Sequence, residues 1–216
     1  MPNRMIRVLV LALAAIAIHA VPAAASTITL TMDDLPTQSV NGLVHPAGVT
    51  FGFTVNSVGN LDARYRLGGP GQITYVQDPS IEGTTLGVLS LTFSSPTPLL
   101  EFGVARNIQA NVLNGAGVEL FDASNISLGV TSLALVRMPS YAEARFAYSG
   151  VPVKRATVNF TTAAFQVGGS RFAFDNLKFS VVPEPTAAVL AVFSLVGVSR
   201  VRVPAHRRER RFQLAR

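Results

Sequence analysis

The sequence contains no cysteine and no tryptophan, and only 14% of its 216 residues are charged. The lack of cysteine excludes disulfide bonds, a thiolate nucleophile and zinc bound by thiolates. His19 and His206 lie near the two ends of the chain, so His45 is the one histidine of its middle part. A single histidine provides neither a cluster of metal ligands nor a catalytic triad that can be identified from sequence. We therefore predict that the protein is not an enzyme.

The net charge of +6 comes from the two ends of the chain. Residues 1–25 contain two arginines and no acidic residue, and residues 183–216 contain seven arginines and two glutamates. The segment between them, 26–182, has nine basic and ten acidic side chains and is therefore nearly neutral. Because a neutral body lacks the basic surface with which proteins bind nucleic acid, no nucleic-acid partner is expected.

The N-terminal residues have the three parts of a secretory signal peptide. Two arginines precede an apolar stretch, 8–20, and small residues follow it, Ala23 and Ala25 among them. The apolar stretch is too short for a transmembrane helix. We therefore predict that residues 1–25 form a signal helix, that signal peptidase cleaves before Ser26, and that the protein is exported.

Between residues 26 and 182, apolar and polar residues alternate with a period of two. Val49, Phe51 and Phe53, for example, alternate with Thr50 and Gly52. This pattern is typical of strands with one buried and one solvated face. Strands are predicted over residues 27–32, 49–56, 72–77, 89–94, 99–106, 117–122, 126–136, 143–148, 156–161 and 172–181.

Turn sequences predicted to separate these strands include Pro96-Thr97-Pro98 and Asn114-Gly115. In the last strand, Phe174 and Leu177 belong to opposite phases of the alternation, which predicts a β-bulge at Asp175-Asn176. The pattern as a whole predicts an all-β domain, 26–182, folded as a single antiparallel β-sandwich of jelly-roll-like type.

The C-terminal residues contain a short motif, an apolar run and a basic cluster in that order. The motif is Val182-Pro183-Glu184-Pro185, and its two prolines end the preceding strand. The apolar run predicts a transmembrane helix over residues 186–203, and the arginines of the tail, 200–216, keep the end of the chain in the cytoplasm. These arginines are Arg200, Arg202, Arg207, Arg208, Arg210 and Arg211.

This arrangement resembles the PEP-CTERM sorting signal of Gram-negative bacterial envelope proteins. The resemblance implies that residues 183–216 enter the inner membrane transiently and that an exosortase recognises and cleaves them there. It also implies that the mature protein reaches the cell surface or the extracellular space. The body is similar, more loosely, to sandwich domains found upstream of this signal, through Met32-Asp33-Asp34-Leu35 and Phe174-Asp175-Asn176-Leu177.

Three aspartates are candidate ligands of a structural calcium ion, which needs six to eight oxygens. They are Asp33, Asp34 and Asp175, which meet if the first and last strands are neighbours. In the alternative that we favour, Asp33 and Asp34 cap a turn before Pro36 and Asp175 anchors the bulge through backbone amides. No other cofactor is predicted.

Tyrosines and arginines of the body are candidates for a sugar-binding surface. They are Tyr65, Tyr75, Tyr141, Tyr148, Arg64, Arg66, Arg137 and Arg145. The alternative is that the tyrosines are half-buried residues at the rim of a sandwich, which the lack of tryptophan favours.

Two functions agree with the sequence. One is a non-catalytic surface or extracellular-matrix protein that binds exopolysaccharide, and the alternative is a secreted hydrolase that acts on an extracellular polymer. The scarcity of catalytic side chains favours the first function.

Overall fold

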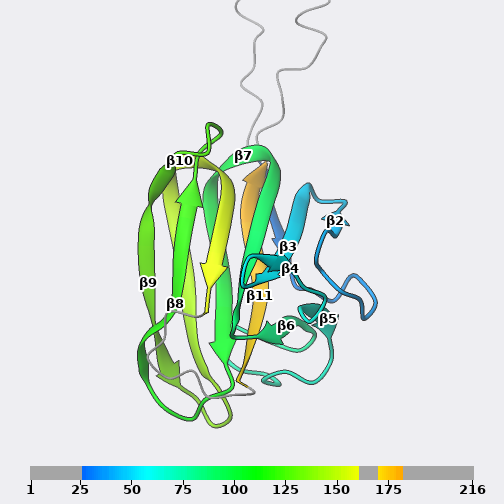
Figure 1. Cartoon of the computed structure of the whole chain (residues 1–216), viewed down its shortest axis with the longest axis vertical. Coiled ribbons are helices and arrows are strands. Elements are labelled where there is room, and N and C mark those ends of the chain that lie inside the picture. Colours follow the sequence, from blue (N-terminus) through cyan, green and yellow to red (C-terminus); the bar gives the residue numbers. More distant parts are fainter. Residues whose placement is uncertain (1–25, 161–169, 182–216) are drawn as a thin grey trace, which may run out of the picture. The chain divides into compact units, whose positions relative to one another are not determined.

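The computed structural model describes residues 26–160 and 170–181, which form eleven strands and no helix. The strands are β1 (Ser26–Leu30), β2 (Val44–His45), β3 (Val49–Val55), β4 (Val58–Gly59), β5 (Arg64–Arg66), β6 (Ser80–Thr84), β7 (Gly87–Arg106), β8 (Val112–Phe121), β9 (Ser127–Arg137), β10 (Ala142–Asn159) and β11 (Arg171–Val181) (Figure 1). The predicted signal peptide, with Ala23 and Ala25, lies outside the described residues, as does the predicted sorting signal from Val182 to the end. Within 26–160 and 170–181, no helix is long and apolar enough to cross a membrane.

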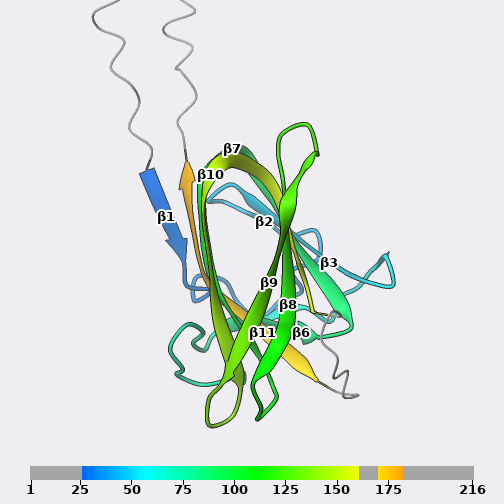
Figure 2. The same cartoon turned by 90° about the vertical axis from the view of Figure 1, so that its left-hand side faces the viewer.

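The strands are antiparallel and follow the order β5-β6-β11-β7-β10-β8-β9, with β1 added to β11 and β3 added to β7. The long strands β7 and β10 change partners along their length. Residues 87–93 of β7 pair with β3, whereas its residues 100–106 pair with β11. Figure 2 shows β7 and β10 curving over at one end of the molecule. The hydrogen-bonded network therefore folds into two layers, and the predicted all-β sandwich is confirmed.

The corner in β7 lies at Pro96-Thr97-Pro98, which the sequence predicted as a turn between two strands. That prediction is wrong, because the chain continues through this segment as one strand. Proline has no amide to donate, so the pairing with β10 is irregular here, with register shifts on both sides of Val153. Thr97 is fully buried, and its hydroxyl donates to the carbonyl of Leu99 at 2.7 Å and accepts from the amide of Ser180 at 2.9 Å.

Three further expectations differ from the structure. Predicted strands 143–148 and 156–161 belong to one strand, β10, which ends at Asn159. Asn114-Gly115 lies within β8, where the pairing with β9 is irregular between Val112 and Ala116. Residues 72–77 form a loop with a single bridge between Gln72 and Gln77.

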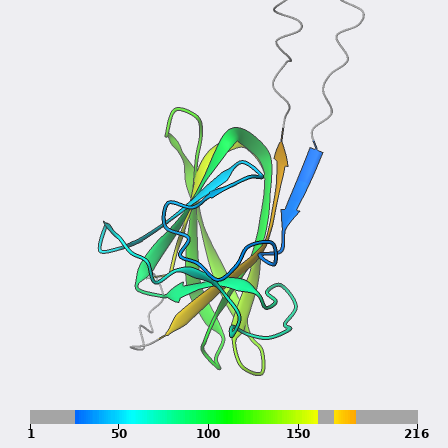
Figure 3. The ribbon, with the colours of Figure 1, turned by 90° about the vertical axis from the view of Figure 1, so that its right-hand side faces the viewer.

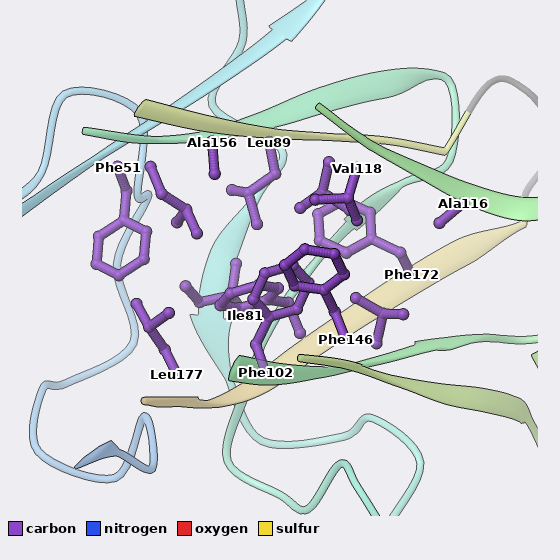
Figure 4. Close-up of a cluster of buried hydrophobic side chains, with 14 of the residues drawn as sticks. Phe51, Ile81, Leu89, Phe102, Ala116, Val118, Phe146, Ala156, Phe172 and Leu177 are labelled. Carbon is purple, nitrogen blue, oxygen red and sulfur yellow. The ribbon is translucent and has the colours of Figure 1, made fainter. Parts of the chain in front are cut away.

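Aromatic rings from both layers fill the space between them. Phe172 of β11 stacks on Phe160 with ring centroids 4.1 Å apart, and its centroid is 5.7 Å from that of Phe53 in β3. Figure 4 shows Phe102 and Phe146 side by side in this core, with their centroids 4.9 Å apart. Each such side chain stabilises the fold by about 1.5–3 kcal/mol through burial, so the aromatic contacts hold the two layers together.

Strand β11 contains the predicted bulge. Its pairing with β7 shifts between Asp175 and Lys178, and Asn176 has a φ of 54°. Phe174 and Leu177 are three positions apart and would face opposite sides of a regular strand. Because of the bulge, both belong to the core. β1 pairs with β11, and Figure 3 shows the two strands side by side, so the first and last strands are neighbours.

Candidate functional site

The loop between β5 and β6, residues 67–79, packs on the outer face of the sheet. A Cβ at Gly103 of β7 would overlap the carbonyl oxygen of Tyr75. The backbone of the loop therefore comes so close to β7 that this position accepts only glycine. A small hydrophobic cluster, separate from the main core, consists of Val76, Ala105, Tyr141 and Ala173. The loop is therefore seated on the sheet through apolar contacts although it is not a strand.

Two buried carboxylates bind the backbone of this loop. Glu143 of β10 accepts hydrogen bonds from the amide of Thr74 at 3.0 Å and from the amide of Tyr75 at 2.8 Å. Asp175 of β11 accepts from the amide of Gln77 at 2.9 Å. The two hydrogen bonds to Glu143 fix the position of Tyr75, and the hydrogen bond to Asp175 holds the next part of the loop.

An open pocket of about 260 Å³ lies beside the loop. Its lining residues come from four strands and the loop: Thr29, Thr74, Tyr75, Glu101, Phe102, Gly103, Arg145, Asn176 and Lys178. Tyr75 is 40% exposed. The pocket thus combines an accessible aromatic ring with hydroxyl, amide and charged groups.

Glu101 connects the two cations of the pocket. Arg145 Nη2 donates to Glu101 Oε2 at 2.5 Å, and Lys178 Nζ lies 3.8 Å from Glu101 Oε1. The hydrogen bond from Arg145 to Glu101, together with the charge of Glu101, raises the pKa of Arg145, so the guanidinium stays protonated. The lining of the pocket therefore contains two donors, Arg145 and Lys178, on either oxygen of one acceptor, Glu101.

Of the eight residues predicted as a sugar-binding surface, only Tyr75 and Arg145 meet at this pocket. Tyr65 is buried against Phe51, and Tyr141 is buried beneath the loop. Tyr148 is partly buried and donates its hydroxyl to the carbonyl of Val151. Arg64 and Arg66 belong to β5 and Arg137 ends β9, and these three exposed residues do not line the pocket. Of the four tyrosines, Tyr148 is the one that is half-buried, as the alternative expected.

The three predicted calcium ligands do not form one set in the structure. Asp34 Oδ2 lies 2.5 Å from His45 Nε2, whereas Asp175 holds the amide of Gln77. Burial raises the pKa of Asp175 to about 7, and the negative charge of Asp33 contributes to the rise. Among the described residues, no group of three or more histidine, aspartate and glutamate side chains is arranged to bind a metal ion.

His45 and Asp34 resemble the basic half of a hydrolase triad. His45 Nδ1, however, accepts a hydrogen bond from the amide of Ala47 at 3.1 Å, while Nε2 faces Asp34. Both ring nitrogens are engaged and the side chain is buried, so neither is free to remove a proton from a nucleophile. The pair connects the segment after β1 to the end of β2.

No protein-family model matches the sequence, and no curated protein is significantly similar to it. The chain is similar to solved carbohydrate-binding modules. One is a family 29 module, with 14% identity over 74% of this chain and 96% of that chain and a TM-score of 0.36. Another is the family 32 module of C. perfringens NanJ in complex with galactose, with 10% identity over 66% of this chain and 99% of that chain and a TM-score of 0.38. Similarity of this degree does not transfer a ligand or a binding site to this chain.

Proposed function

We propose that the protein is an exported, non-catalytic surface or extracellular-matrix protein whose β-sandwich binds exopolysaccharide at the pocket beside Tyr75. The observation that carries this proposal is the pocket itself, in which an exposed tyrosine ring lies among polar and charged side chains. A sugar presents an apolar face that stacks on aromatic rings and hydroxyl groups that both donate and accept hydrogen bonds.

The polar groups of the pocket match sugar hydroxyls. Arg145 and Lys178 donate, Glu101 accepts, and Asn176 does both. The volume of about 260 Å³ lies just below the range of about 300–1,000 Å³ that is typical of small-molecule sites. An open pocket of this size suits a short stretch of a longer polymer.

The same pocket does not support the alternative of a hydrolase. Glycoside hydrolysis uses two carboxyl groups about 5–9.5 Å apart, on either side of the scissile bond. Among the described residues that line the pocket, Glu101 is the one carboxylate, and two cations already surround it. Binding without cleavage is therefore the better proposal.

Delivery to the cell surface is proposed from the sequence. Signal peptidase would remove residues 1–25, and an exosortase would process the segment after the PEP motif, Val182-Pro183-Glu184-Pro185. β1 begins at Ser26 and β11 ends at Val181, and these two residues pair. In the sequence, the two proposed processing sites therefore lie directly outside the two ends of the sandwich. We also propose that the sandwich is of the jelly-roll-like type, and that a signal helix precedes it and a transmembrane helix follows it.

Two experiments test the proposal. Affinity electrophoresis of the full-length protein through a panel of polysaccharides should show retardation by at least one, without release of reducing sugars. Sugar release would instead support the hydrolase. Separately, replacing Pro183-Glu184-Pro185 by alanines should leave the precursor in the inner membrane of an exosortase-containing strain, and normal secretion of the variant would argue against the sorting signal.

A further inference from the structure

Three side-chain oxygens converge at Gly69, beneath the loop 67–79. A Cβ at Gly69 would lie 2.6 Å from Asp78 Oδ1, 3.1 Å from Glu82 Oε1 and 3.1 Å from Ser80 Oγ. Asp78 belongs to the loop, whereas Ser80 and Glu82 are on β6. A residue without a side chain at position 69 therefore allows the three oxygens to gather.

Two of these oxygens are buried without a hydrogen-bond partner. Glu82 is 2% exposed and Ser80 is 0% exposed. Across the part of the chain that the structure describes, neither Glu82 Oε1 nor Ser80 Oγ has a hydrogen-bond partner. An unpaired buried carboxylate oxygen is costly, because it has lost its water and gained nothing in exchange. The arrangement thus lacks a positively charged or donating partner at its centre.

The surrounding charged groups do not supply this partner. Arg66 Nε is 3.9 Å from Glu82 Oε2, which is too far for a hydrogen bond, and the Arg66 side chain is 46% exposed. Arg171 donates instead to Asp62 at 3.2 Å. Burial raises the pKa of Glu82; the charges of Arg66 and Arg171 oppose the rise, and the charge of Asp78 adds to it. Two carboxylates therefore face each other with their charge only partly balanced.

We propose that Asp78, Ser80 and Glu82 bind a divalent cation, and that calcium fits this set best. The donors are two carboxylates and a hydroxyl, which are the hard oxygen ligands that calcium prefers. Transition metals favour imidazole or thiolate ligands, which these three residues do not offer. Backbone carbonyls and water would complete the six to eight oxygens of calcium. These ligands differ from Asp33, Asp34 and Asp175, the set predicted from the sequence.

A cation at this place would fix the loop to β6. Asp78 already accepts from the amides of Gly69 and Gly71, each at 3.0 Å, so it links the ion to the first part of the loop. Thr74 and Tyr75, in the same loop, line the pocket. An effect of calcium on polysaccharide binding therefore rests on the proposed function, whereas the cation site itself does not.

Calcium titration of the full-length protein, purified in detergent and treated with EDTA, tests the proposal. Added calcium should raise the thermal midpoint by several degrees in a concentration-dependent manner, because an ion that binds the folded state stabilises it by mass action. Terbium bound at the site should show tyrosine-sensitised luminescence, since the chain has no tryptophan and Tyr141 lies near Asp78 and Glu82.

Three variants make the test specific. Glu82→Gln should abolish the calcium response but raise the thermal midpoint in EDTA, because it removes a buried, incompletely paired charge; simple misfolding would lower that midpoint. Ser80→Ala should weaken the response. The matched control is Glu119→Gln on β8, where the carboxylate accepts a hydrogen bond from Ser127 at 2.7 Å, and it should respond as the wild type does.

The absence of any calcium or terbium effect at millimolar concentration would overturn the proposal, as would an unchanged response in Glu82→Gln. A proton shared by Asp78 and Glu82 would show itself as pH-dependent stability that calcium does not alter, and this result would also overturn it. Tyr75→Ala separates the two proposals, because it should lose polysaccharide binding and keep the calcium response.

Discussion

Replacing Glu143 by alanine tests whether buried carboxylates hold the loop 67–79 on the sheet. Glu143 is 3% exposed, and its two oxygens accept from the amides of Thr74 and Tyr75 at 3.0 and 2.8 Å. The substitution removes both acceptors at once. Unless the loop moves into water, two backbone donors then remain without a partner.

The size of the effect follows from these two contacts. A hydrogen bond to a charged group contributes about 1.5–3 kcal/mol, and a loop that relaxes into water recovers part of this. We therefore expect the free energy of unfolding to fall by about 2–4 kcal/mol. Affinity for polysaccharide should fall as well, because Thr74 and Tyr75 line the pocket.

Urea denaturation of the full-length protein measures the loss of stability. Glu119→Ala is the control, because Glu119 is partly exposed and, among the described residues, its carboxylate accepts a hydrogen bond from the hydroxyl of Ser127 alone. A change within about 0.5 kcal/mol is expected. If Glu143→Ala is no more destabilising than Glu119→Ala, the role given to the buried carboxylates is wrong.

Three other substitutions have defined outcomes. Gly103→Ala should destabilise the fold by about 1–3 kcal/mol in thermal unfolding, because the added Cβ meets the backbone of Tyr75. If the variant is as stable as the wild type, the loop does not pack on β7 at this position. Burial raises the pKa of Asp175 to about 7, so the folded protein keeps a proton on this residue that the unfolded chain releases near pH 4. The contribution of Asp175 to stability is therefore full below about pH 4 and is lost as the pH rises to about 7. The free energy of unfolding should fall by on the order of 1 kcal/mol per pH unit over this range. Asp175→Asn should remove this dependence of the thermal midpoint in EDTA, and equal slopes in both proteins would contradict the assignment. Phe172→Ala should cost about 3–5 kcal/mol in urea unfolding because the ring contacts both layers, and a loss below about 1 kcal/mol would mean that the core packs differently.

The faces of the strands could be predicted from the sequence, but their ends could not. Alternation placed Phe51 and Phe53 in the core, because successive side chains of a strand point to opposite faces and only one face is buried. The phase change at Asp175-Asn176 predicted the bulge for the same reason. Pro96-Thr97-Pro98 was misassigned because a corner within a strand and a turn between strands both favour residues without an amide donor.

The pocket could be predicted only in part. Tyr75 and Arg145 were chosen by residue type, but Glu101 and Lys178 were missed, because they meet through the pairing of β11 with β7 and of β10 with β7. Sequence alone does not show which strands pair. Asp34 was considered as a metal ligand or, in the favoured alternative, as a turn cap, and its contact with His45 was missed because the path of the loop that brings the two together leaves no local sequence signal.

Isothermal titration of polysaccharide into the full-length protein and its Tyr75→Ala variant tests the central claim most directly. The wild type should bind, and Tyr75→Ala should bind at least about tenfold more weakly, a difference of about 1.4 kcal/mol. Tyr148→Ala is the matched control, because this ring does not line the pocket, and it should bind as the wild type does. Equal affinity of Tyr75→Ala and the wild type would contradict the account.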